Sequence, residues 1–309
     1  MIPGDQLRSI VGLSIVEQIQ GTVLGDNVTK GILTAKQHEA YLRDGYVLVR
    51  GLFNEAETDL LRSAMENDPN IADKLYARQD NDGGATRMMT WNHPGDSAYG
   101  LAARSERVVE TMENLLGGEV YHYHSKLTAK FAREGGAWEW HQDYGYWYHN
   151  GCLEPLMASL MIALDHATPE NGCLQVLKGS HLLGRIDHNL TVGAQVGADI
   201  ERLEEIKKRL ELVYCEMEPG DGLFFHCNTL HRSDANKSDK RRWTLICCYN
   251  AARNDPVIEH HHPGYTPLHK VPDSALLDAG MKFGEGDKEG FFAAPANPHS
   301  CSCSNDTVR

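Results

Sequence analysis

Short strand-like runs make up the second part of the chain, and they limit the possible folds more than any other feature. From residue 119 onward, runs rich in β-branched, aromatic and aliphatic residues alternate with clusters of Gly, Pro, Asn and Asp. The runs are EVYHYHSKLTAKFA, PLMASLMIALD, LELVYCEM, GLFFHC and RRWTLICCYN. Such spacing is typical of antiparallel strands in a sandwich or barrel. One insertion differs, because ADIERLEEIKKRLEL has apolar residues at helical spacing: Ile200, Leu203, Ile206 and Leu210.

Helical signals precede these strands. Thr34 is a favourable N-cap, Asn54 and Glu57 have the spacing of a capping box, and Gly117 is placed to end a helix. We predict helices over 34–43, 54–67 and 105–116, and a short strand over 46–50. Helices that lead and strands that follow predict a mainly β fold with flanking helices. The specific expectation is a double-stranded β-helix, of the jelly-roll or cupin-like type, with N-terminal helices.

The chain has no internal repeat and no low-complexity linker, so a single domain is the simplest organisation for its 309 residues. We expect an N-terminal extension over 1–33 and one double-stranded β-helix domain over 34–295. The Ser- and Asn-rich tail over 296–309 is expected to be disordered. Cys301 and Cys303 in this tail are able to bind a soft metal, but disorder is the favoured interpretation.

Charge and composition exclude several kinds of partner. The formal net charge of −13 argues against binding to nucleic acid, which requires a basic face. Charged residues interrupt the N-terminus, and no apolar run approaches the ~20 residues that cross a bilayer, so neither a secretion signal nor a membrane span is expected. Eight cysteines are too sparse for a disulfide framework, which predicts reduced thiols. We therefore expect a cytoplasmic protein; its oligomeric state is not predicted.

His141, Asp143 and His231 are the candidate metal ligands. In a strand, residues i and i+2 point to the same face, so His141 and Asp143 can ligate one ion inside a barrel. The His-x-Asp pair alone is a weak signal, because it occurs by chance in a chain with 16 histidines. His231 follows the strand-like run FFHCNTL and supplies a third ligand from a distant strand.

These ligands suit more than one metal. Two imidazoles and one carboxylate occupy one face of an iron(II) octahedron and leave positions for substrate and oxygen. Zinc accepts the same ligands with one open water position. The residues alone leave three hypotheses open: an iron oxygenase, a zinc hydrolase that activates water, and a non-catalytic metal-binding β-barrel.

Three segments, in order, carry a family resemblance. AWEWHQDYGYW, LMIALDHATPENGCLQVLKGSH and PGDGLFFHCNTLHRSDANKSDKRRW resemble the phytanoyl-CoA dioxygenase family, which includes ectoine hydroxylase. The resemblance implies a double-stranded β-helix, iron(II) held by His141, Asp143 and His231, and O2 and 2-oxoglutarate as cosubstrates. In the family, 2-oxoglutarate is oxidised to succinate and carbon dioxide while the substrate is hydroxylated.

Arg242 is the candidate anchor for the far carboxylate of 2-oxoglutarate. A guanidinium can hold both oxygens of a carboxylate, and Arg242 lies eleven residues beyond His231, where the family has its 2-oxoglutarate arginine. Arg241 would face the opposite side of the strand and is interpreted as a surface charge. Thr244 shares the inward face of Arg242 as a hydroxyl partner. An inward guanidinium behind the metal distinguishes the oxygenase from the other two hypotheses.

A second polar face follows from alternation in YHYHSKLTAK. The residues predicted to point the same way are His122, His124, Lys126, Thr128 and Lys130. An exposed face is the alternative reading. The resemblance implies that Lys126 and Thr128 contact 2-oxoglutarate, although ectoine hydroxylase has Arg and Asn there. By the same resemblance, Ser159 is a further cosubstrate contact.

The reaction type and substrate are less constrained. Related iron halogenases have a small, non-ligating residue at the position of Asp143, so a carboxylate favours hydroxylation; desaturation and rearrangement remain open. Tyr144, Tyr146 and Trp147 form an aromatic segment that either packs the barrel or lines a substrate pocket. His124 and His226 are further substrate-binding candidates.

Trp147 matches a tryptophan that lines the ectoine pocket, but the rest of that signature is replaced. Aromatic faces attract cationic groups, so a small polar or zwitterionic molecule other than ectoine is the expected substrate. The run Glu259 to His262 is interpreted as a solvated surface run, with a lid over the site as the alternative.

Overall fold

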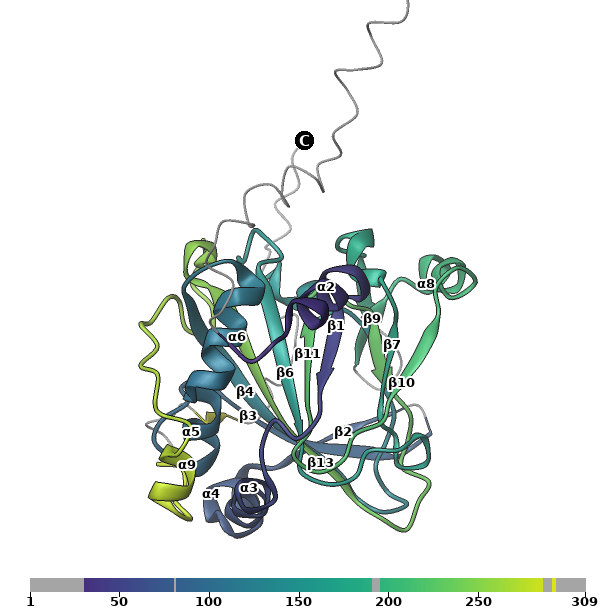
Figure 1. Cartoon of the computed structure of the whole chain (residues 1–309). Coiled ribbons are helices and arrows are strands. Elements are labelled where there is room, and N and C mark those ends of the chain that lie inside the picture. Colours follow the sequence, from purple (N-terminus) through teal and green to yellow (C-terminus); the bar gives the residue numbers. More distant parts are fainter. Residues whose placement is uncertain (1–30, 81, 191–194, 286–290, 293–309) are drawn as a thin grey trace, which may run out of the picture.

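A computed structural model describes residues 31–80, 82–190, 195–285 and 291–292 (Figure 1). The predicted extension over 1–33 lies outside the described residues except for its last three positions. The predicted tail over 296–309, with Cys301 and Cys303, also lies outside them.

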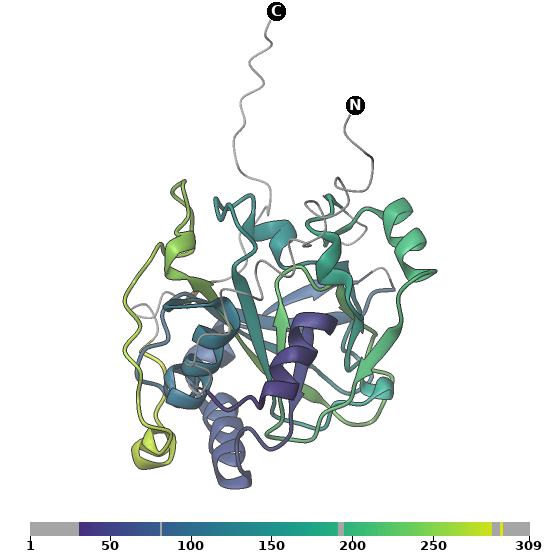
Figure 2. The same ribbon diagram turned by 45° about the horizontal axis from the view of Figure 1, so that its top comes forward.

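The N-terminal helices form where their capping residues predict. Helix α2 (Ala35–Asp44) and helix α3 (Glu55–Asn67) each begin with a complete capping box, at Thr34 and Asn54 respectively. Helix α6 (Glu106–Leu116) ends at Gly117, which has the left-handed backbone that favours glycine. Three shorter helices are α4 (Pro69–Lys74), α5 (Ala98–Arg104) and α9 (Ala275–Ala279). Figure 1 shows α3, α4, α5, α6 and α9 on one side of the strands, and Figure 2 shows α2 in front of them.

The strands form two main antiparallel sheets. The larger, eight-stranded sheet has the order β1-β11-β6-β13-β4-β3-β14, with β2 also paired to β3. Its strands are β1 (Tyr46–Val49), β2 (Tyr76–Gln79), β3 (Ala85–Trp91), β4 (Val120–Lys130), β6 (Met157–Ala163), β11 (Gly222–His226), β13 (Arg242–Ala251) and β14 (Phe291–Phe292). The smaller, four-stranded sheet has the order β10-β7-β12-β5. Its strands are β5 (Trp138–His141), β7 (Leu174–Leu177), β10 (Leu212–Cys215) and β12 (His231–Ser233). This is the predicted double-stranded β-helix.

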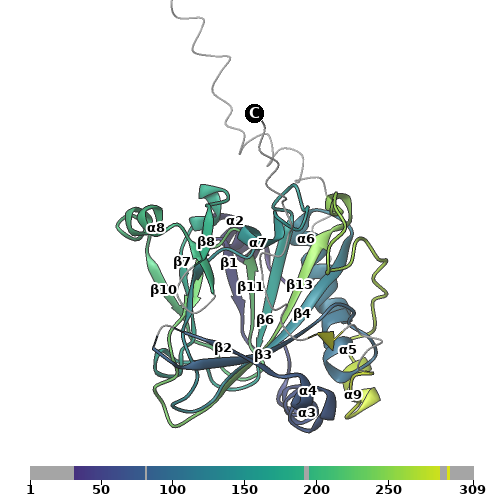
Figure 3. The same ribbon diagram turned by 180° about the vertical axis from the view of Figure 1, so that it is seen from behind.

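The remaining elements lie beside the smaller sheet. Strands β8 (His188–Leu190) and β9 (Val196–Ala198) form a hairpin, and helix α8 (Ile200–Lys207) is the predicted helical insertion. Figure 3 shows β7, β10 and α8 on one side of the molecule and β4 and β13 on the other. Leu203 and Ile206 are buried as predicted, but Ile200 is exposed because it lies at the first position of the helix.

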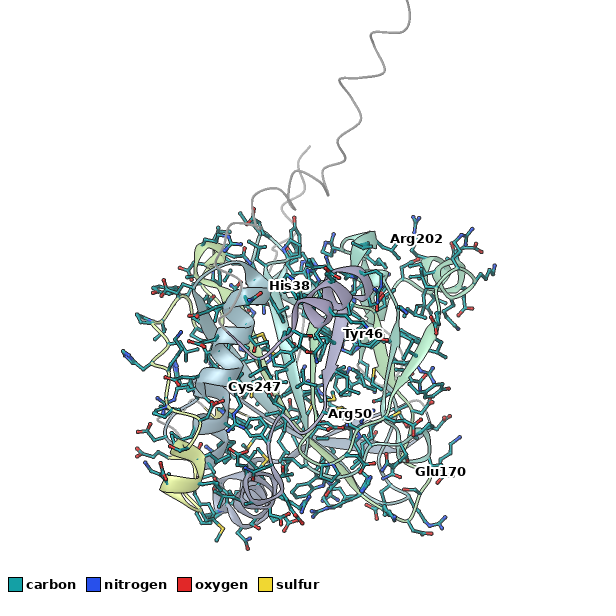
Figure 4. All side chains as sticks on the ribbon, in the orientation of Figure 1. His38, Tyr46, Arg50, Glu170, Arg202 and Cys247 are labelled. Carbon is teal, nitrogen blue, oxygen red and sulfur yellow. The ribbon has the colours of Figure 1, made fainter. Side chains whose placement is uncertain are left out.

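Alternating residues of the large sheet build two cores. On β6, Ala158, Leu160 and Ile162 pack toward the helices, whereas Met157 and Met161 pack into the space between the sheets. Every residue of β6 is buried because both faces of this central strand are covered. In Figure 4, Cys247 of β13 lies inside the molecule, while Arg202 and Glu170 lie at its periphery. The six described cysteines are free and buried, as the sequence predicts.

A β-bulge in β4 corrects one prediction about the polar face. His124 pairs with Cys248 and His122 pairs with Tyr249, so Tyr123 is an extra residue between them. The extra residue reverses the alternation. His122 therefore lies on the face of Ser125, whose hydroxyl is 2.7 Å from its Nε2 atom, and not on the face of His124.

Burial of His122 has a consequence for stability. Burial lowers the pKa of His122 to about 3, whereas an unfolded histidine has a pKa of ~6.5. This contribution to stability is fully present above pH 6.5 and is lost as the pH falls toward 3. The loss is expected to be ~1.4 kcal/mol per pH unit in that window. Urea unfolding at pH 7 and pH 5 should show a smaller difference in His122→Gln than in the wild type; an equal difference would contradict this prediction.

Candidate active site and metal centre

His141, Asp143 and His231 meet between the two sheets. His141 on β5 pairs directly with His231 on β12, and one ligand atom from each of the three side chains lies within 4.8 Å of the others. All three residues are buried. Among the residues that the structure describes, they form the one group of three or more His, Cys, Asp or Glu side chains placed to hold a metal ion.

The path of the chain to Asp143 differs from the prediction. Strand β5 ends at His141, and Asp143 has helical backbone angles at the start of the short helix α7 (Tyr144–Trp147). A turn, and not strand alternation, therefore directs the carboxylate toward the histidines. Gln142 stabilises this turn, because its side-chain amide donates to the carbonyl oxygens of Gly184 and Asn228, each at 2.8 Å.

Backbone carbonyls orient both imidazoles. Nδ1 of His141 donates to the carbonyl of Glu139 at 2.8 Å, and Nδ1 of His231 donates to the carbonyl of Thr229 at 2.9 Å. Each Nε2 atom is then the free, metal-binding nitrogen. Burial lowers the pKa of both imidazoles, and His231 lowers that of His141 further. Both histidines are therefore in the neutral form that binds a metal at physiological pH.

The Asp143 carboxylate is held in its ionised form. Burial raises its pKa, but nearby Lys126, the two histidines and the Ser159 hydroxyl outweigh burial and lower the pKa to about 2. The Lys126 ammonium is 3.5 Å from one carboxylate oxygen, and the Ser159 hydroxyl donates to the other at 3.0 Å. The sequence assigned Lys126 and Ser159 to the cosubstrate. The structure places both beside the metal-binding carboxylate, where they also position Asp143, and their contact with the cosubstrate stays a prediction.

We predict that Ser159→Ala weakens iron binding. The substitution leaves one buried oxygen of Asp143 without its hydrogen bond, and such outer partners of metal ligands are each worth about 10- to 100-fold in metal affinity or activity. Anaerobic titration with iron(II) measures the affinity, and thermal unfolding of the metal-free protein reports any general loss of stability. Wild-type iron affinity in Ser159→Ala would contradict the positioning role.

Arg242 lies in the same cavity as the two histidines. Its side chain is 4% exposed, and it donates to the Gly172 carbonyl at 2.8 Å and to the Thr244 hydroxyl at 3.4 Å. Thr244 is also 2.6 Å from the Thr128 hydroxyl across the strands. Among the described residues, no carboxylate lies within 4.0 Å of the guanidinium. Arg241, in contrast, forms ion pairs with Glu66 and Asp165 and is partly exposed, in keeping with its interpretation as a surface charge.

His141, His231 and Arg242 line one cavity, and Lys126, Thr128, Trp138, Phe225 and Ile246 are also on its walls. Several of its lining residues were missing from the predicted site, among them Ser233 and Lys130. Ser233 follows His231 by two positions on β12, and Lys130 continues the face of Lys126 and Thr128 on β4. Strand alternation was therefore the signal that pointed to both.

The candidate substrate residues separate into two groups. Trp147 contacts His124 edge to face at 5.7 Å, and His124 is stacked on His262 at 4.4 Å. The Tyr146 ring meets that of His141 at 5.9 Å, and its hydroxyl donates to the Val196 carbonyl. Of these residues, Tyr146 contacts a metal ligand directly. His262 is partly buried by this stacking, so it does not belong to a solvated surface run; its position agrees with the lid alternative.

Tyr144 and His226 do not join this group. The Tyr144 hydroxyl donates to the carbonyl of Cys152, and its ring packs in the core between the sheets. Phe225 lines the cavity, so the next residue on β11, His226, points to the opposite side, where its ring lies 5.4 Å from that of His181. His226 therefore lies outside the cavity, which does not support its predicted contact with substrate, and Tyr144 has a packing role.

The fold and site together define a class of enzyme. A double-stranded β-helix that holds two histidines and one carboxylate, with a buried arginine in the same cavity, is the arrangement of a non-haem iron, 2-oxoglutarate-dependent dioxygenase. The sequence model of "Phytanoyl-CoA dioxygenase (PhyH)" matches residues 41–244. The chain therefore belongs to the phytanoyl-CoA dioxygenase family, and the family and enzyme class predicted from the sequence are confirmed.

Similar proteins agree with this assignment. The chain is 30% identical to an L-proline trans-4-hydroxylase of Streptomyces griseoviridis. The aligned 263 residues cover 80% of this chain and 96% of that protein. It is 27% identical to the ectoine dioxygenase of Stutzerimonas stutzeri, over 77% of this chain and 83% of the relative. The crystal structure of EctD from S. alaskensis in its apoform superimposes with a TM-score of 0.66 at 26% identity, covering 79% of this chain and 90% of that one. Relatives of this kind favour the oxygenase over the zinc hydrolase and the non-catalytic module.

Proposed function

We propose that the protein hydroxylates a small polar or zwitterionic molecule and converts 2-oxoglutarate to succinate and carbon dioxide. The observation that carries the proposal is one cavity lined by His141, His231 and the buried Arg242, with Asp143 beside the two histidines and no carboxylate of the described residues in an ion pair with Arg242. When bound, iron(II) and 2-oxoglutarate supply the activation of O2 that inserts one oxygen atom into the substrate.

The cosubstrate side and the substrate side lie at different positions along strand β4. Lys126 lies beside Asp143. Thr128 and Lys130 lie toward Arg242, whereas His124 lies in the opposite direction along the strand. Side chains on one face of a strand repeat every ~6.6 Å. His124 and Lys130 are therefore on opposite sides of the metal ligands. The substrate is expected at the end marked by His124, Trp147 and His262.

The side chains at this end suit a small, polar substrate. Burial lowers the pKa of His124 and of His262, so both stacked rings are neutral at pH 7. His124 Nδ1 is buried and has no hydrogen-bond partner among the described residues, so a polar group of the substrate can bind it. The Trp147 ring beside it offers a face to a cationic amine. Two relatives carry the names of their substrates, L-proline and ectoine, and both substrates are small molecules.

The other residues of the site prepare the reaction without forming bonds to the substrate. Lys126 and Ser159 keep Asp143 ionised, and the Glu139 and Thr229 carbonyls hold each histidine with Nε2 toward the ligand cluster. His262, from the segment after β13, packs on His124 and limits access of water from that side. These residues thus orient the metal ligands and shield the metal from water.

Two further expectations belong to the proposal. Free, buried thiols suit a reducing compartment, which supports the cytoplasm as the location. A single double-stranded β-helix domain over 34–295 accounts for both sheets and their helices. Among the described residues, no helix is long and apolar enough to cross a bilayer.

Substrate screening tests the proposed function. Purified iron-loaded protein is supplied with 2-oxoglutarate and oxygen, and succinate is measured with cyclic and linear amino acids, betaines, small amines, an acyl-CoA and a peptide. We expect stimulation only by small polar molecules. Trp147→Ala should raise the KM for the best substrate, whereas Tyr148→Ala, whose side chain is 41% exposed, should leave it unchanged. Stimulation by the acyl-CoA or the peptide alone would refute the proposal.

A further inference from the structure

We propose that Lys130 is a second cationic residue of the cosubstrate pocket and that it binds, jointly with Arg242, the carboxylate of 2-oxoglutarate that is distant from the iron. The inference rests on the use of 2-oxoglutarate and is independent of which substrate is hydroxylated. It assigns a ligand-binding role to a lysine that sequence reasoning placed on the polar face of β4 without a function.

Lys130 and Arg242 are direct neighbours across two strands. They are Cα partners in the β4–β13 ladder, and both line the cavity that holds the metal ligands. Lys130 is 1% exposed and Arg242 is 4% exposed. Like charges directly opposite each other destabilise a sheet, and burial removes the water that would screen them. Both side chains are therefore stable in their charged forms together only if an anion compensates them.

Among the described residues, no carboxylate forms an ion pair within 4.0 Å of Lys130 or Arg242, and Asp80, Asp165 and Asp234 act on them only from a longer distance. Lys130 Nζ donates to the Ser233 hydroxyl at 2.8 Å and to the carbonyl of Asp234, both of which are uncharged acceptors. The Asp234 carboxylate is bound instead by Arg232 and by the side-chain amide of Gln175. Burial, with repulsion from Arg242, lowers the pKa of Lys130 well below its usual value, and burial lowers that of Arg242 to about 10. A bound carboxylate would favour the charged form of both groups.

Gly172 brings the two cationic heads together. Its carbonyl accepts from Arg242 Nη2 at 2.8 Å, and a Cβ atom added at this glycine would lie 3.3 Å from Lys130 Nζ. The same Cβ would lie 2.2 Å from the Asp234 carbonyl oxygen, so no larger residue fits this backbone. The ammonium and the guanidinium therefore both lie next to Gly172. Ser233, which lines the cavity and is bonded to Lys130, adds a hydroxyl there.

The alternative is that Lys130 only braces the turn after β12 through Ser233 and Asp234. A brace would affect stability and the binding of any 2-oxo acid equally. A carboxylate-binding lysine would affect only ligands that have the distant carboxylate. Two ligands of equal chain length separate these roles: 2-oxoglutarate, and 2-oxopentanoate, which lacks that carboxylate.

Anaerobic titration of the iron-loaded protein provides the test, with the visible metal-to-ligand charge-transfer band as the readout of the Kd. In Lys130→Met, the Kd for 2-oxoglutarate is expected to rise by about 10- to 100-fold, the effect of losing one charged hydrogen-bonding partner. The Kd for 2-oxopentanoate should stay within about twofold of the wild type, because no carboxylate contact is lost. Lys178→Met, which removes a half-exposed lysine near Asp44, is the matched control and should change neither value.

Lys130→Gln is a control for a folding defect, because the glutamine amide keeps a hydrogen-bond donor for Ser233 while the positive charge is removed. It should lose 2-oxoglutarate affinity as Lys130→Met does. Equal weakening of both ligands, or unchanged affinity for 2-oxoglutarate in both variants, would overturn the role of Lys130. Absence of the band in the wild type would instead refute the use of 2-oxoglutarate itself, and with it this inference.

Discussion

Asp143→Ala is expected to abolish tight iron binding and to reduce succinate formation to near background. The residue supplies the one anionic ligand of the cluster, and its removal leaves the partly buried Lys126 without its carboxylate partner. Outer partners of metal ligands are each worth about 10- to 100-fold, so losing the ligand itself should cost at least about 100-fold in iron affinity. Iron content after anaerobic loading and desalting measures the effect directly, and succinate formation provides the second measurement.

Asp239→Ala is the matched control for this prediction. Asp239 is an exposed aspartate that pairs with Arg133 at the surface, so its loss should leave iron content unchanged. If Asp143→Ala retained wild-type iron content and wild-type succinate formation, the assignment of the metal centre would be wrong. Unfolding of the metal-free variants shows whether any loss of iron reflects a loss of the fold.

Arg242→Ala is expected to remove 2-oxoglutarate binding while iron binding persists. Truncating one partner of a buried charge pair costs about 2–5 kcal/mol, so the Kd for 2-oxoglutarate should rise by about 30-fold to several thousand-fold. Arg242 has no contact with His141, Asp143 or His231 among the hydrogen bonds and ion pairs of the described residues. The charge-transfer band on titration reports the cosubstrate, and iron content reports the metal. The two measurements therefore separate failure at Arg242 from failure at the metal.

Arg241→Ala is a close control, because it removes the same side chain one position earlier. Arg241 is ion-paired to Glu66 and Asp165 outside the cavity, so its loss is expected to leave the Kd for 2-oxoglutarate unchanged. An undiminished band in Arg242→Ala, or an equal loss in both variants, would show that the buried guanidinium is not the anchor of the cosubstrate.

Local features of the chain were sufficient to predict helices α2, α3, α6 and α8 and strands β1, β4, β6, β10, β11 and β13, but not the shorter helices or the other strands. The capping boxes at Thr34 and Asn54 satisfy backbone groups within four residues, so they act the same way in any fold. Alternation along β13 placed Arg242 and Thr244 on one inward face and Arg241 outside, and the structure has them there. Regular strands transmit such patterns faithfully because their side chains repeat every two residues.

Predictions were wrong where the backbone departs from regular geometry. The extra residue Tyr123 reverses the face of His122, and helical angles at Asp143 replace the expected strand. A bulge and a turn depend on the partner strand and on distant residues, which a local pattern does not contain. His226 was assigned to the site by its closeness to His231 in the sequence, but Phe225 occupies the cavity face of β11.

By itself, the sequence determined which residues are able to bind the metal and the cosubstrate, because the ligand chemistry of His141, Asp143, His231 and Arg242 does not depend on the fold. Only the tertiary structure decided which side chains surround them. Lys126 and Ser159 face Asp143, and Lys130 faces Arg242, through contacts between strands that are far apart in the chain. The energies of buried charges depend on such neighbours and on burial, and both arise when the two sheets close on each other.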